Sequence, residues 1–242
     1  MQPNSTPGVP PTTEGNLSFL QRLIQLFIKP SAAFAAVRQN PRWITPAIVV
    51  LLLTAGMTWY LTPAIQKEQR ERMTAQMEKR GMDQEQIATA VEGINKPWMK
   101  YMMLGSAVVG SLLVILAMAG IWLLVAKSVL GGEACYAHML EVVSLSMIIP
   151  TLGMLFKAPI IHYKETMNVH FSLATFMPDS SRDSFLYKFL MNSDFFNIWF
   201  IAVLCIGIAV VSGLKVQKVW PVVVGLLVVW YLASAAIGGL FA

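Results

Sequence analysis

One carboxylate stands inside an apolar stretch of this sequence, and it has the clearest capacity for chemistry. Glu141 lies near the start of the apolar block 138–156. A charged side chain within a membrane is unfavourable by about 3 kcal/mol, so it normally pairs, or faces a cavity or a substrate path. Two interpretations follow. Glu141 either reaches the interface, where it pairs with Lys127 or caps a neighbouring helix, or it carries a proton or solute in transport.

Pro150 and Gly153 interrupt the same apolar block further along the chain. A proline within a membrane helix releases a backbone hydrogen-bonding group, which neighbouring helices can satisfy. The block can therefore still span a membrane. Broken helices line substrate sites in transporters, while a packing kink has the same sequence signature. Pro150 is thus a second candidate site residue, with a kink and a polar path as its alternatives.

Asp194 and Trp199 stand at the start of another apolar block, 195–214. The side chains of Ser193 and Asp194 can accept hydrogen bonds from the exposed N–H groups of a first helical turn. A tryptophan one turn further on is typical of the membrane interface. We interpret this pair as a helix start with an interfacial anchor rather than as a site of chemistry.

Signatures of catalysis and of cofactor binding are missing from the sequence. It contains no nucleophile elbow, phosphate loop, dinucleotide fingerprint or zinc-protease motif. His138, His162 and His170 do not have the spacing of metal ligands. Methionines between residues 73 and 103 could suggest a soft metal, but methionine is also a common apolar filler. We expect a protein that is not an enzyme, with no cofactor and no metal.

The elements that position these residues must be membrane helices. Of the 242 residues, 56% are hydrophobic and only 13% are charged, whereas soluble domains carry about 25% charged residues. Basic and acidic residues are mixed in every polar stretch, and no basic cluster interleaved with aromatic residues suggests nucleic acid. The two cysteines, Cys135 and Cys205, are expected to be packed, reduced thiols. The excess of apolar side chains requires lipid as its surroundings.

Five apolar blocks have the length of membrane-spanning helices. They cover about residues 43–61, 101–126, 138–156, 195–214 and 219–240. A span needs about 20 predominantly apolar residues, and tryptophan and tyrosine often mark its ends. We therefore predict an all-α polytopic bundle of about five transmembrane helices. The third block, which carries the glutamate and the proline, has the weakest sequence signal.

Shorter elements precede and connect the spans. Residues 1–16 have the composition of a disordered tail, so the membrane domain is predicted to occupy residues 17–242. Residues 17–28 form an amphipathic helix too short to span, with Gln21, Arg22 and Gln25 on its polar face, and this predicts an interfacial helix. A second short helix, 31–39, is expected to begin with Ser31 as its N-cap.

The loop from Thr62 to Lys100 is highly charged, with seven basic and six acidic residues interspersed. Gly81 divides it into two helical pieces, and Asp83 is a candidate N-cap of the second. The net charge of the chain is +5. Because basic and acidic residues nearly balance within this loop, the lysines and arginines outside it decide the predicted orientation, and they favour a cytosolic N-terminus.

Pairs of small residues four positions apart occur in three of the spans. Such pairs let helices approach closely, and they do so more often within one bundle than between two copies of a chain. Assembly into a homo-oligomer is the alternative that they allow. The pairs are Ser106/Gly110, Ala209/Gly213, Ser234/Gly238 and Ala235/Gly239.

Several short motifs follow one another along the chain. They are Phe27-Ile28-Lys29-Pro30, Phe34, Pro41-Arg42-Trp43 with Pro46, Gly131-Gly132, Glu141-Val142-Val143-Ser144, Pro150, the run from Asp194 to Trp199, Gly207 and Lys215. Their order and spacing, over about residues 18–240, resemble those of the Yip domain (Ypt/Rab-interacting protein) family of polytopic membrane proteins, in its bacterial form. The loop segment 82–87 also looks like one found in bacterial members.

This resemblance implies five spans and a cytosolic N-terminus. Eukaryotic members of the family bind Rab-type GTPases and act in vesicle traffic, while bacterial members supply no activity that can be carried over. We therefore predict an integral protein of a bacterial inner membrane that acts as a scaffold or partner-binding protein. Its binding surfaces would be the N-terminal helix and the loop from Thr62 to Lys100. The alternative is a small transporter or channel that uses Glu141 and the kink at Pro150.

Overall fold

The computed structural model describes residues 17–94, 96–167, 169 and 194–240, with side chains described as far as Val229. Throughout this part of the chain the regular structure is helical, and it contains no strand beyond an isolated bridge residue at Asp194. The predicted all-α fold is therefore confirmed. The tail predicted over residues 1–16 lies outside the described residues.

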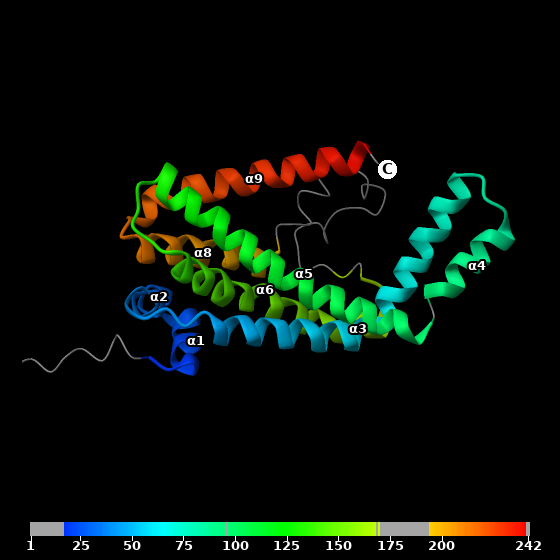
Figure 1. Ribbon diagram of the computed structural model, residues 1–242, viewed down its shortest axis with the longest axis horizontal. Coiled ribbons are helices and arrows are strands. Elements are labelled where there is room, and N and C mark those ends of the chain that lie inside the picture. The colour runs from blue at the N-terminus through cyan, green and yellow to red at the C-terminus, as the bar shows by residue number, and fades with distance from the viewer. Residues whose placement is uncertain (1–16, 95, 168, 170–193, 241–242) are drawn as a thin grey trace, which may run out of the picture.

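Four described helices are long and apolar enough to cross a membrane. They are α3 (Ile44–Lys79), α5 (Pro97–Leu124, followed by a π-helical turn, Val125–Val129), α6 (Tyr136–Lys164) and α8 (Phe195–Ser212). They lie alongside one another in a single elongated bundle, as Figure 1 shows. The chain is thus a polytopic helical membrane protein.

Helix α6 is the centre of this bundle. It contacts α3, α5 and α8, and 61% of its most apolar window is buried, against 17–44% for the other three spans. A helix surrounded by protein can hold polar groups and prolines, because its neighbours supply their partners. The weak sequence signal of the third span follows from this central position.

Helix α9 (Val216–Leu240) is the predicted fifth span. A turn at Gly213, which has a φ of +70°, joins it to α8, and the two helices pack together. Its described apolar part, Val216–Val229, is shorter than a span. The fifth crossing therefore stays a prediction.

Two short helices, α1 (Phe19–Ile28) and α2 (Pro30–Gln39), close one end of the bundle. Ser18 and Gln21 form a reciprocal capping box at the start of α1. The expected N-cap at Ser31 is wrong: α2 begins with Pro30, whose fixed φ suits a first helical position and which needs no N–H there.

At the opposite end, a helical hairpin projects from the bundle (Figure 1). Helix α3 does not stop at the membrane, as the sequence suggested, but continues to Lys79, and α4 (Gln84–Ile94) returns beside it. The predicted break and cap are confirmed. Gly81 has a φ of +72°, and Asp83 accepts a hydrogen bond from the N–H of Gln86 at 2.9 Å.

Aromatic side chains mark where α3 leaves the apolar part of the bundle. The ammonium of Lys100 lies 3.4 Å from the ring centroid of Trp59, and Tyr101 packs against the same ring. From Ile44 to Leu61, α3 is about 27 Å long at the helical rise. This length matches a hydrocarbon core of about 30 Å, so the hairpin lies outside it.

Candidate functional site

Glu141 is buried, with 1% of its surface exposed, and its partner is Arg22. The guanidinium Nη1 of Arg22 lies 2.5 Å from Glu141 Oε1, although the two residues are 119 positions apart. Arg22 is also 1% exposed. The side chain expected on the outward polar face of the first helix therefore points into the protein, and Lys127 is not the partner found for Glu141.

Every polar nitrogen and oxygen of this ion pair has a partner. Arg22 donates from Nη2 to the carbonyl of Asn40 at 3.0 Å and from Nε to the carbonyl of Leu17 at 3.2 Å. The second carboxylate oxygen of Glu141 accepts from the backbone N–H of Arg42. Because buried charges are tolerated when they are paired and hydrogen-bonded, this arrangement joins α1, the connection between α2 and α3, and α6.

The depth of the pair explains how a carboxylate fits into a spanning helix. Arg42 precedes Trp43, which is the N-cap of α3, so Glu141 lies level with the start of that span rather than with its middle. It accepts from the N–H of Arg42, which precedes the N-cap, so Glu141 does not cap α3 as one of the alternatives expected. Its arginine partner comes from a helix outside the spans.

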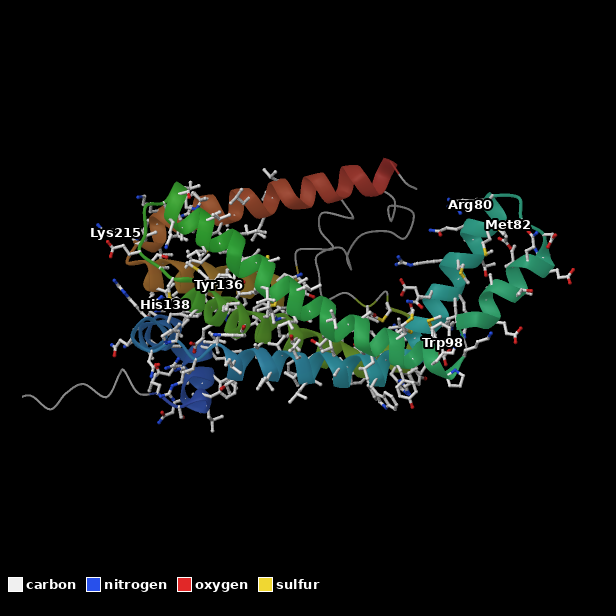
Figure 2. The ribbon with its side chains drawn as sticks, viewed as in Figure 1. Arg80, Met82, Trp98, Tyr136, His138 and Lys215 are labelled. Atoms are coloured by element: carbon white, nitrogen blue, oxygen red, sulfur yellow. The ribbon has the colours of Figure 1, made fainter. Side chains whose placement is uncertain are left out.

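His138 adds a contact one turn before the glutamate. Its Nδ1 lies 3.3 Å from the N–H of Cys135 and 3.1 Å from the thiol, and its Nε2 lies 3.2 Å from the carbonyl of Arg38. With Nδ1 accepting from the Cys135 N–H, Nε2 carries the proton and donates to Arg38. Cys135 is exposed, not packed as expected, whereas Cys205 is buried. Figure 2 shows His138 and Tyr136 at the end of the bundle formed by α1 and α2.

A second ion pair lies towards the opposite end. The ammonium of Lys157 on α6 pairs with Asp194, whose side chain is 4% exposed. The other carboxylate oxygen of Asp194 accepts from the N–H of Phe196 at 2.8 Å, so Asp194 caps α8. Ser193 lies outside the described residues. One carboxylate thus caps α8 and ties its start to α6.

Trp199 is half-buried and packs against aromatic side chains of α1 and α8, and its role as an interfacial anchor stays a prediction. Its ring meets that of Phe27 edge-on, with centroids 5.2 Å apart, and that of Phe195 at 5.7 Å. In the sequence, Phe27 and Trp199 belong to two separate motifs. Their contact fastens α1 to the side of α8.

Close packing around Gly207 holds α2, α6 and α8 together at the same end of the bundle. A Cβ placed on Gly207 of α8 would lie 2.7 Å from Val142 Cγ1 and 3.0 Å from Phe34 Cζ. Phe34 is completely buried. Only a glycine lets α2, α6 and α8 approach this closely, which gives a structural reason for three of the separate motif positions.

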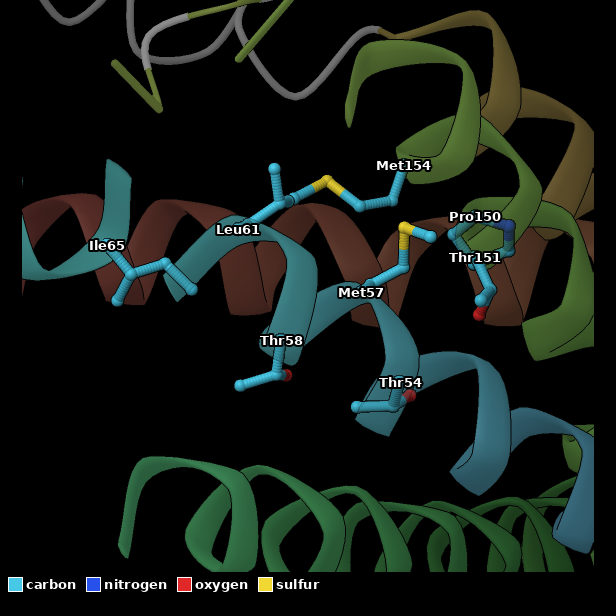
Figure 3. A pocket seen from close by; sticks show the side chains of 8 residues that line it. All are labelled: Thr54, Met57, Thr58, Leu61, Ile65, Pro150, Thr151 and Met154. Carbon is cyan, nitrogen blue, oxygen red and sulfur yellow. The ribbon is translucent and has the colours of Figure 1, made fainter. Parts of the chain in front are cut away.

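Pro150 lies away from Glu141, in the wall of a groove of about 320 Å³ between α3 and α6. Figure 3 shows Pro150, Thr151 and Met154 facing the side chains of α3 across this space. Glu141 does not line the groove. The two residues proposed to share a polar path are therefore not brought together.

Among the described residues, no group of three or more histidines, cysteines and carboxylates comes together as metal ligands would. His162 instead stacks on Tyr60, with ring centroids 4.7 Å apart. His170 lies outside the described part.

Arg22 and Lys157 are the site residues that the sequence alone did not single out. A signal was present for Arg22. It is a single cation in a short apolar helix, and Glu141 is a single anion in an apolar span. Two isolated, opposite charges in apolar surroundings are candidates for each other.

The fold and this buried polar cluster define a polytopic α-helical membrane protein whose N-terminal helices are part of the bundle. A family model, the Yip1 domain, matches residues 24–237, which is nearly the whole chain. The chain belongs to the Yip1 domain family, as the motif order predicted. No curated protein and no solved structure matches it.

Proposed function

We propose that this chain is a non-enzymatic Yip-family membrane protein that acts as a scaffold or partner-binding module. The observation that carries the proposal is the distribution of charge. Glu141 and Asp194, the two buried carboxylates in the part of the chain that the structure describes, are both held in ion pairs. The hairpin of α3 and α4, in contrast, places exposed charged side chains outside the membrane. They include Glu71, Glu78, Lys79, Arg80 and Glu85.

The outer side of α1 is the second proposed surface. Leu20, Ile24 and Ile28 are 63%, 50% and 79% exposed on one edge of this helix. Because Arg22 fixes the opposite edge against the bundle, these side chains face outward at the level of the interface. An amphipathic helix in this position places its apolar edge into one leaflet. The same edge is available to the apolar face of a partner.

We place the N-terminal end in the cytosol of a bacterial cell, with the protein in the inner membrane. Basic residues are concentrated at this end of the described chain and favour the cytosolic side. They are Lys29, Arg38, Arg42, Lys127, Lys215 and Lys218. The single acidic side chain exposed among them in the described segments is Glu133. Transport is not proposed, because Glu141 does not line the groove to which Pro150 belongs.

Photocrosslinking in cells tests the scaffold proposal. A photoreactive amino acid at Ala75 or Gln76, both exposed on the hairpin, is expected to give a discrete protein adduct. Reversing the charges of Glu71 and Glu78 should weaken that adduct severalfold, since the contact relies on exposed charge. The matched control is Leu113, which is exposed on α5 within a span and should give no protein adduct. Absence of adducts from the hairpin and from Gln21 on α1, in well-expressed protein, would refute the proposal.

Cysteine labelling tests the orientation. Cys135 is exposed at the N-terminal end of the bundle, while Cys205 is buried. A membrane-impermeant maleimide should therefore label inverted inner-membrane vesicles strongly and intact spheroplasts hardly at all. Cys135→Ser should abolish the labelling. Strong labelling of spheroplasts would place this end outside the cytosol.

A further inference from the structure

A groove and a polar pocket follow one another along α3 and meet at Ile65. The groove, of about 320 Å³, is lined by Thr54, Met57, Thr58, Leu61 and Ile65 of α3 with Pro150, Thr151 and Met154 of α6. The pocket, of about 250 Å³, is lined by Ile65, Glu68, Gln69, Arg72 and Met167. Because Ile65 lines both, the two are adjacent, and we treat them as the apolar half and the charged half of one elongated site.

The apolar half lies at membrane depth. Of its α3 side chains, Thr54, Met57, Thr58 and Leu61 lie before Trp59 or within one turn of it, and Trp59 marks the end of the apolar part of the bundle. In Figure 3, Met57 and Leu61 lie towards Pro150 and Met154 across the groove. A space of this kind between two spans is surrounded by hydrocarbon, so an acyl chain is its natural occupant.

The charged half lies one to three helical turns beyond Leu61, on the part of α3 outside the hydrocarbon. Glu68 Oε1 pairs with Arg72. Glu68 Oε2 is buried and has no hydrogen-bond partner among the described residues, although the Glu68 side chain as a whole is 19% exposed. The pocket is therefore lined by a partly exposed carboxylate, one oxygen of which lacks a partner, next to an arginine that is 73% exposed.

We propose that this site binds one phospholipid with a primary-amine headgroup. One acyl chain lies in the groove, the ammonium donates to the Glu68 carboxylate, which turns its unpartnered oxygen towards the headgroup, and the phosphate accepts from Arg72. The charge pattern supports this choice, because a carboxylate recognises an N–H donor and an arginine recognises a phosphate. A choline headgroup has no N–H to donate. A phosphoglycerol headgroup carries the same phosphate for Arg72 but has no ammonium of its own to pair with Glu68.

Native mass spectrometry of the full-length protein in mild detergent tests the proposal. Delipidated protein is titrated with phosphatidylethanolamine, phosphatidylcholine and phosphatidylglycerol of matched acyl chains. One phosphatidylethanolamine should bind per chain, about tenfold more tightly than the other two lipids. Similar binding of all three lipids would overturn the proposal.

Two substitutions separate the halves of the site. Glu68→Gln should remove the preference for the amine headgroup, because the amide carries no charge to attract an ammonium. Thr58→Phe should fill the groove and weaken binding about tenfold. The control is Leu113→Phe, on the exposed face of α5, which should leave binding unchanged. Thermal unfolding of each variant shows that the fold is retained.

A photoreactive acyl chain on the amine lipid gives a readout on the unchanged protein, and a photoreactive residue at Thr58 gives the reciprocal one. Labelled peptides should come from α3 and α6 around the groove. If labelling is spread evenly over α5 as well, or if a photoreactive residue at Thr58 crosslinks to protein instead of lipid, another occupant fills the groove and the proposal fails.

Discussion

Replacing Glu141 with glutamine is expected to lower the free energy of unfolding by about 3–5 kcal/mol. The change leaves the guanidinium of Arg22 buried, with 1% exposure, and without its counter-charge. Removing one member of a buried pair is far more damaging than removing a surface pair, because the remaining charge has lost its solvation as well as its partner. Unfolding in detergent, followed by heat or by titration with denaturing detergent, measures the loss.

Glu165→Gln is the matched control for this substitution. Glu165 pairs with Lys67 at 3.2 Å, but its side chain is 58% exposed. Solvent screens such a pair, so its loss should cost less than about 1 kcal/mol. Equal effects of the two substitutions would mean that Glu141 is solvated and that the pair does not hold the helices together.

Phe34→Ala is expected to have a comparable effect, a loss of about 3–5 kcal/mol. Phe34 is completely buried and lies against Gly207 and Val142, so its removal leaves a cavity where α2, α6 and α8 meet. The rigid close approach of α8 at Gly207 limits collapse around that cavity. The midpoint of thermal unfolding in detergent should fall accordingly.

Phe156→Ala provides the comparison, because Phe156 is 64% exposed and lies within the same bundle. Its removal should change stability by less than about 1 kcal/mol, since little buried area is lost. Similar losses for the two phenylalanines would show that α2 is only loosely attached to the bundle.

The helices and their approximate ends could be predicted from the sequence because their signals are local. The lengths of the apolar blocks predicted the spans. Gly81 and Asp83 predicted the turn of the hairpin, and Asp194 predicted the start of α8. The extension of α3 to Lys79 was missed. Charge shows where a chain leaves the membrane, but a helix can continue through that boundary into water.

The contacts that make the site could not be predicted because they join distant segments. The helical periodicity groups Arg22 with the polar residues of its helix, and polar residues usually face water. Arg22 faces the protein instead because Glu141, which is 119 residues away in the sequence, lies beside it. Lys157 and Asp194 are similarly separated along the chain. The groove at Pro150 depends on how α3 and α6 lie relative to each other, which no single segment specifies.

The family resemblance and the structure explain the same residues in different ways. The motif order identified a Yip1 domain, which the family model matches over residues 24–237. The structure gives these motifs physical roles: Phe34 fills the space above Gly207, and Arg42 donates its N–H to Glu141. Short motifs far apart in sequence thus meet at one end of the bundle.

A double-mutant cycle on Arg22 and Glu141 tests the central claim, that their buried ion pair fastens the N-terminal helices to the membrane bundle. Arg22→Met, Glu141→Gln and the double variant are compared with the unchanged protein by equilibrium unfolding in detergent. Each single change should lose about 3–5 kcal/mol. The double variant should recover at least about 2 kcal/mol of the summed loss, because it leaves no unpaired buried charge. Single losses that add within about 0.5 kcal/mol in the double variant would contradict the claim.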